Sequence, residues 1–155
     1  MKLTLESKSS LIKMLYLGYS GEGKSTSLVP LGIPGYLDNP GYELRILDFD
    51  GKAEEVIRST LVRLRKEGLI TQEQHDKALL ENYDVCPCLE PTGIVSTREG
   101  KRTVKKLGIE GTSMDWNTAI KQLEKWSGSF SDKTILVVDS FTYAVRAITN
   151  FCQEL

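Results

Sequence analysis

The segment at residues 18–25, GYSGEGKS, constrains the fold more than any other part of the chain. It matches the phosphate-loop pattern G-x-x-x-x-G-K-[ST] in full. A chance match in a chain of this length is on the order of one in a few hundred. An apolar run, LIKMLYL at 11–17, precedes the loop, and a short helix can start at Lys24 and end before Pro30. The sequence therefore predicts a buried strand, a glycine-rich loop and a helix in succession.

These residue types suit a phosphate group. Glycines allow positive φ, so several backbone N–H groups can turn toward one concavity at the N-terminus of a helix. A lysine can reach the β- and γ-phosphates, and the serine hydroxyl can ligate Mg²⁺. The alternative is a turn that merely joins strand to helix. The predicted triphosphate site comprises Gly18, Tyr19, Ser20, Gly21, Glu22, Gly23, Lys24, Ser25 and Thr26.

A second feature is an aliphatic strand that ends in an acid, ILVVD at 135–139. Its carboxylate is expected at the carboxyl edge of the sheet, where α/β proteins bind their ligands. There Asp139 could hold a water molecule on the Mg²⁺ that Ser25 ligates. The alternative is an exposed acid at a strand end.

Two more acids close the strand predicted at 42–49, in the segment LDFDG. Period-two alternation predicts that Asp48 and Asp50 lie on one face. If that strand end faces the γ-phosphate, Asp50 can orient the attacking water, and burial beside a second carboxylate would raise its pKa. Two solvated acids at a turn are the alternative.

The rest of the chain predicts an α/β fold, a mostly parallel sheet flanked by helices. Residues 30–41 are rich in Pro and Gly and predict a loop, and Pro87 suggests that residues 83–88 form a short edge strand. His75 is expected to be a solvated helix residue. Trp116 and Trp126 are expected in the core or an interface rather than as base-stacking platforms. Helices are predicted over 53–66, 72–82, about 112–126 and 141–152, the last with an apolar face of Phe141, Val145, Ile148 and Cys152.

Composition limits the partners and the compartment. The chain has 20 Lys and Arg against 21 Asp and Glu, so no global positive charge attracts nucleic acid. Locally, residues 91–111 carry five basic and two acidic residues and could form a basic hairpin, which either grips a nucleic-acid backbone or is simply solvated. Three cysteines, a polar N-terminus and short aliphatic runs predict a cytoplasmic protein without a membrane segment. Cys86 and Cys88 are expected on or beside a strand rather than at a metal.

Taken in order, GYSGEGKS, RILDFDG and TILVVDS resemble the RecA-like P-loop ATPases, and most closely a phage-encoded nucleotide-binding group that includes single-strand-annealing recombination proteins. The resemblance implies that ATP and Mg²⁺ are the cofactors, with Lys24, Asp50 and Asp139 as catalytic residues and Ser25 and Asp139 at the metal. Asp50 matches the acid that positions the hydrolytic water, where RecA itself has Glu. The implied role is ATP hydrolysis in phage DNA recombination or annealing, with single-stranded DNA as partner, a homo-oligomeric assembly and the host cytoplasm as location.

In RecA-like folds, the strand that follows the Walker B acid inserts between the Walker A and Walker B strands. The residues after Asp139 predict a helix instead, so we expect residues 1–155 to be the N-terminal part of a single P-loop NTPase domain, with 91–111 as a basic hairpin insertion. A small-molecule phosphotransferase is the alternative function. A GTPase switch is a weaker one: DFDG at 48–51 fits D-x-x-G, but it follows Lys24 too closely and the chain has no N-K-x-D motif.

Overall fold

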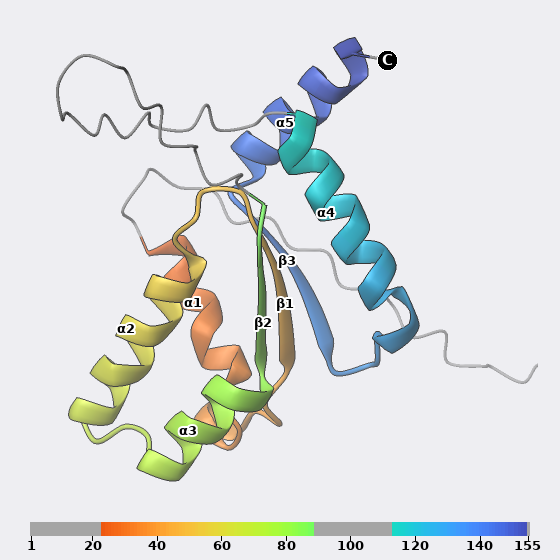
Figure 1. Cartoon of the computed structure of the whole chain (residues 1–155). Helices are drawn as coiled ribbons and strands as arrows, with labels where there is room; N and C mark the ends of the chain where they lie inside the picture. Colours follow the sequence, from red (N-terminus) through yellow and green to blue (C-terminus); the bar gives the residue numbers. More distant parts are fainter. Residues whose placement is uncertain (1–22, 89–112, 155) are drawn as a thin grey trace, which may run out of the picture.

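A three-stranded parallel sheet forms the centre of the protein. The structure, a computed structural model, describes residues 23–88 and 113–154 (Figure 1). The strands are β1 (Glu43–Asp48), β2 (Tyr83–Pro87) and β3 (Thr134–Asp139), in the order β2-β1-β3. Because β1 is parallel to both neighbours, all three strands end at the same edge of the sheet. The expected α/β class is confirmed as a small parallel sheet flanked by helices.

Helices lie on both faces of this sheet (Figure 1). The helices α1 (Lys24–Leu28), α2 (Ala53–Lys66) and α3 (Gln72–Glu81) lie on one face. On the other face lie α4 (Ser113–Trp126) and α5 (Phe141–Glu154), of which α5 extends beyond the carboxyl edge of the sheet. Short 3₁₀ turns occur at Val29–Gly32, Tyr36–Asp38 and Ser127–Ser129.

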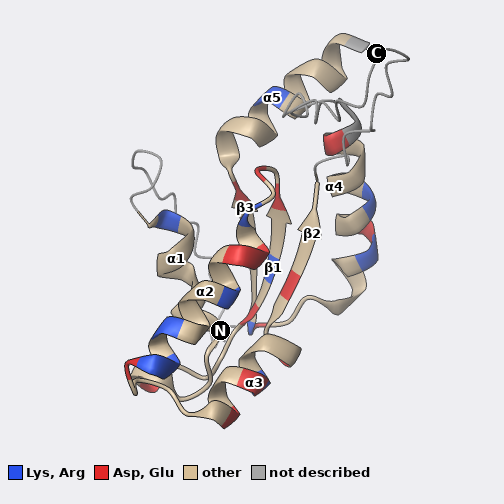
Figure 2. Cartoon of the chain, turned by 60° about the vertical axis from the view of Figure 1, so that its left-hand side comes forward, with Lys and Arg blue, Asp and Glu red and all other residues tan. Residues whose placement is uncertain are grey.

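The alternation of β1 divides the core into two clusters. Leu44 and Ile46 pack against α2 and α3 in one cluster, whereas Leu47 belongs to the other cluster with α4 and α5. Successive side chains of a strand point to opposite faces, so the apolar residues of this central strand fill clusters on both sides of the sheet. Charged residues lie on the outward-facing surfaces of α2 and α3 (Figure 2).

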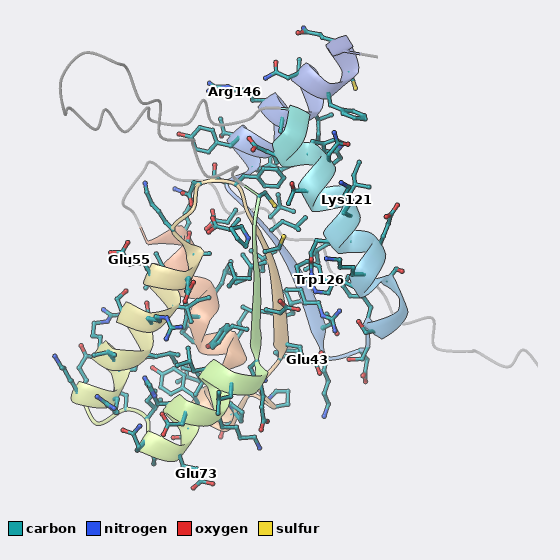
Figure 3. The ribbon with its side chains drawn as sticks, in the orientation of Figure 1. Glu43, Glu55, Glu73, Lys121, Trp126 and Arg146 are labelled. Atoms are coloured by element: carbon teal, nitrogen blue, oxygen red, sulfur yellow. The ribbon has the colours of Figure 1, made fainter. Side chains whose placement is uncertain are left out.

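A polar cluster ties the start of β3 to the sheet. The guanidinium of Arg45, on β1, donates hydrogen bonds to the Ser129 hydroxyl (2.6 Å) and carbonyl (3.0 Å). The indole N–H of Trp126 donates to the Asp84 carboxylate on β2 (2.7 Å), and the Trp126 ring lies between α4 and the strands (Figure 3). These bonds link the turn between α4 and β3 to both other strands.

Most predicted elements are confirmed within a residue or two. The helix expected over 53–66 is α2, and the one expected over 72–82 is α3, which begins with the capping box formed by Thr71 and Gln74. Among the described strands β2 is at an edge, which is where Pro87 is tolerated. Trp126 is buried, as expected of a core residue. The predicted strand at 11–17 and the predicted hairpin at 91–111 lie outside the described residues.

Three local expectations were wrong. Residues 30–41 contain two 3₁₀ turns rather than only a loop, and α1 passes directly into the first of them at Val29. His75 is only 9% exposed, because it lies on the same face of α3 as the fully buried Ala78. In α5, Ala144 and Ala147 are the buried residues, whereas Phe141 and Val145 of the expected apolar face are exposed.

No helix in the described ranges combines the length and the apolar character that a membrane span requires.

The packing of Tyr83 on Gly32 yields a stability prediction. A Cβ atom at Gly32 would lie 2.5 Å from the Tyr83 ring, whose hydroxyl donates a hydrogen bond to the Val29 carbonyl (2.6 Å) and so resists displacement. We expect Gly32→Ala to lower the free energy of unfolding by about 1–3 kcal/mol, measured by urea denaturation. Gly128→Ala is the control, because a Cβ there meets nothing within 4 Å. Equal effects of the two substitutions would contradict this packing.

Candidate functional site

Two motif residues that lie far apart in the sequence meet at the carboxyl edge of the sheet. The Ser25 hydroxyl, in the first turn of α1, donates a hydrogen bond to the carboxylate of Asp139, the last residue of β3. The two residues are separated by 114 positions, so tertiary folding brings them together. Both side chains are half-buried.

The alternation of β3 explains the direction of the Asp139 side chain. Ile135 and Val137 pack on the cluster formed with α2 and α3, and Asp139 follows them at the same period. Its carboxylate therefore points to the face that α1 covers. A small cavity of about 10 Å³ lies beneath this contact, between α1, α2 and the sheet; its lining includes Ser25, Val137 and Asp139. Such a cavity is far too small for a nucleotide, so a ligand would have to bind outside it, beyond the strand ends.

The start of α1 has the backbone conformation that its glycine allows. Gly23 precedes the helix with φ of 76°, in the left-handed region, and its carbonyl accepts the Ser27 N–H (2.9 Å). Lys24, Ser25 and Thr26 follow as the first three residues of the helix and are all half-buried. The five other residues predicted to line the phosphate site, Gly18, Tyr19, Ser20, Gly21 and Glu22, lie outside the described residues.

Asp48 has a structural task that the sequence analysis missed. It is the last residue of β1, opposite Asp139 in the parallel register, and only 3% exposed. Its carboxylate accepts the backbone N–H groups of Asp50 (3.3 Å), Gly51 (2.9 Å) and Ala53 (3.0 Å). The buried carboxylate is thus satisfied by the loop and by the first residue of α2, and the signal for this was an acid at a strand end followed by a glycine-containing turn that leads into a helix.

Asp50 lies beyond the end of β1, so strand alternation does not determine its direction, contrary to the expectation. The side chain is half-buried, and its carboxylate accepts the Lys52 N–H (3.1 Å). Burial raises the pKa of Asp50, and a hydrogen bond with Asp48 and its negative charge add to this, while Lys52 acts in the opposite direction. No hydrogen bond of the described residues joins Asp50 to Ser25 or to Asp139.

The backbone around these acids is tied together. The Phe49 N–H donates to the carbonyl of Asp139, and the Cys88 N–H donates to the carbonyl of Asp48 (2.8 Å). The chain segments that leave the three strands are therefore linked across the sheet edge. Acidic residues gather at the carboxyl ends of β1 and β3 (Figure 2).

A buried carboxylate and two thiols lie near the same edge. Asp115, in the first turn of α4, is only 1% exposed, and the sequence had suggested it only as part of a capping pattern. Cys86 is on β2 and Cys88 directly follows it, as expected, and burial raises the pKa of both thiols. Buried, protonated thiols are poor nucleophiles.

Over residues 23–88 and 113–154, His, Cys, Asp and Glu side chains form no group of three that could hold a metal ion.

No family model, no curated protein and no solved structure matches the chain in comparisons with known proteins. The contact between Ser25 and Asp139 is the feature of the described residues that bears most directly on function.

Proposed function

We propose that the chain is a RecA-like P-loop ATPase that binds ATP and Mg²⁺ at the carboxyl edge of its sheet. The observation that carries this proposal is the hydrogen bond between Ser25 and Asp139. The serine ends a complete phosphate-loop pattern, and the aspartate ends an aliphatic strand. Each motif alone has a plain structural alternative. A shared metal and phosphate site, however, accounts for the contact between the terminal residues of the two motifs.

The chemistry of this pair fits Mg²⁺. The ion prefers oxygen ligands and is held in nucleotide sites by one or two protein groups together with phosphate oxygens and water. The Ser25 hydroxyl and the Asp139 carboxylate supply two such oxygens close together. Bound Mg²⁺ would neutralise charge on the phosphates, and the neighbouring Lys24 would add a positive charge from the start of α1.

The sheet is compatible with a RecA-like arrangement. Such a fold requires a further strand beside the one that carries the Walker B acid. Within the described part of the chain, β3 is hydrogen-bonded to β1 on one edge only, so its second edge can accept another strand. The position of Asp139 at the carboxyl end of a parallel strand agrees with the general location of ligand sites in α/β proteins.

Asp50 is the proposed base that orients the attacking water. A general base works best when its pKa lies near the working pH, and burial and Asp48 move the Asp50 pKa upward. A GTPase switch built on D-x-x-G is disfavoured, because the Asp48 carboxylate is buried and engaged by three loop and helix amides. The proposed biological role remains phage DNA recombination or single-strand annealing, and a small-molecule phosphotransferase is the alternative.

The first prediction concerns nucleotide binding. We expect Lys24→Ala to weaken ATP binding at least about 100-fold in calorimetry, because the lysine charge on the phosphates is lost. Lys77→Ala, on the exposed side of α3, is the matched control and should bind ATP as the wild type does. Unchanged ATP affinity in Lys24→Ala would reject the site.

The second prediction concerns the metal. In Ser25→Ala and Asp139→Asn the gain in ATP affinity that Mg²⁺ produces should fall about 10- to 100-fold, because an oxygen ligand or its support is lost. Binding of ATP without Mg²⁺ should change little. Ser25→Thr is the control, since it keeps the hydroxyl that the phosphate-loop pattern permits. If Mg²⁺ strengthens ATP binding equally in Ser25→Ala and the wild type, Ser25 is not a metal ligand.

The third prediction concerns turnover and its partner. Asp50→Asn should retain ATP binding but lower kcat for hydrolysis about 100-fold or more, because the water loses its base. Phosphate release is measured at low salt with and without single-stranded DNA, which tests the DNA partner. GTP is added as a competitor to test the choice of nucleotide, and nucleosides are added as acceptors to test phosphate transfer. Stimulation by DNA supports the recombination role. Transfer of phosphate to nucleosides without a DNA effect would favour the phosphotransferase.

A further inference from the structure

The short loop between β1 and α2, residues 49–52, is organised by a single buried side chain. Both carboxylate oxygens of Asp48 accept hydrogen bonds: Oδ1 from the N–H groups of Asp50 and Gly51, and Oδ2 from the N–H of Ala53. Hydrogen bonds to an ionised acceptor are about twice as strong as neutral ones. Through these three hydrogen bonds, Asp48 fixes the path of the backbone from β1 to α2.

The loop also needs a specific backbone shape. Gly51 has φ of 73°, which side-chain-bearing residues rarely adopt, and its N–H points at the Asp48 carboxylate. At the other end of the loop, Phe49 is anchored by its hydrogen bond to the Asp139 carbonyl. The loop is thus fixed by two sets of hydrogen bonds: those that the Asp48 carboxylate accepts, and the one between Phe49 and the end of β3.

The position of Asp50 depends on the hydrogen bonds within this loop. Its N–H is bound by Asp48 and its carboxylate by the Lys52 N–H, so two loop bonds locate the side chain. Asp48 and Lys52 are also the charged groups that act on Asp50, and they do so with opposite signs.

We propose that Asp48 is a positioning residue, whose buried carboxylate holds the 49–52 loop so that Asp50 stays at the sheet edge where Ser25 and Asp139 meet. The inference rests on the proposed function insofar as Asp50 is the base for hydrolysis. Asp48 itself would touch neither the nucleotide nor the metal. Its effect on turnover would pass entirely through Asp50.

The test uses the full-length protein and the substitution Asp48→Asn. The amide keeps the size of the side chain, but it replaces one acceptor oxygen with a donor that cannot bind the N–H groups of the loop. We expect kcat to fall about 10- to 100-fold with little change in KM, because a misplaced base slows the chemical step. In an Asp50→Asn background the same substitution should leave the residual kcat unchanged. Independent, multiplying effects of the two substitutions would overturn the inference.

A second pair of variants leaves every carboxylate in place. Gly51→Ala strains the loop at its positive φ, and Gly68→Ala places the same strain at φ of 71° in the turn between α2 and α3. Comparable losses of stability are expected, but only Gly51→Ala should lower kcat. Equal kcat values in these two variants would contradict a role for the loop geometry.

A readout independent of ATP separates this inference from the proposed function. The carboxyl ¹³C resonance of Asp50, titrated by NMR, should give a lower pKa in Asp48→Asn than in the wild type, because a neighbouring negative charge is removed. The acidic limb of the kcat profile should move to lower pH in the same direction. If the wild type binds no ATP, the proposed function fails while the titration still decides the link between the two acids. An unchanged Asp50 titration in a folded Asp48→Asn protein would overturn the inference.

Discussion

The parallel pairing of β1 with β3 is the interaction on which the candidate site depends. It aligns Asp48 with Asp139 and brings the ends of two strands that are distant in the sequence to one edge of the sheet. Since alternate residues of β3 pack toward α2, the same register also turns the Asp139 carboxylate toward α1 and Ser25. A shift of one residue would send this carboxylate to the opposite face.

The central position of β1 explains why this register is well specified. Its apolar side chains contribute to clusters on both faces, and Arg45 binds the turn that leads into β3. A slip of one residue would therefore break the hydrogen bonds of Arg45 to Ser129 and would turn Leu44 and Ile46 away from the cluster that they fill. The site is supported by the whole sheet rather than by local loops alone.

The acids at the sheet edge have different surroundings and, we infer, different tasks. Asp139 is half-buried and bound by a hydroxyl, which leaves oxygen lone pairs for a metal. Asp48 is buried and bound by backbone amides, so it stabilises a loop. Asp50 is intermediate: burial, and after it the neighbouring Asp48, raise its pKa, yet the side chain is partly open to solvent. Environment, rather than residue type, separates these roles.

The sequence by itself determined the α/β class, the bounds of most helices and strands, and the residue types of the phosphate-loop pattern and of the acidic strand ends. These are local properties, set by periodicity, capping and turn chemistry. Only the tertiary structure decided which acid meets Ser25, that Asp48 binds the loop amides, and that His75 is buried. It also decided that α5 packs through its alanines, which allow close approach to Ala119, rather than through its larger apolar residues. Contacts of this kind depend on how elements distant in the sequence are juxtaposed, and no local pattern encodes that arrangement.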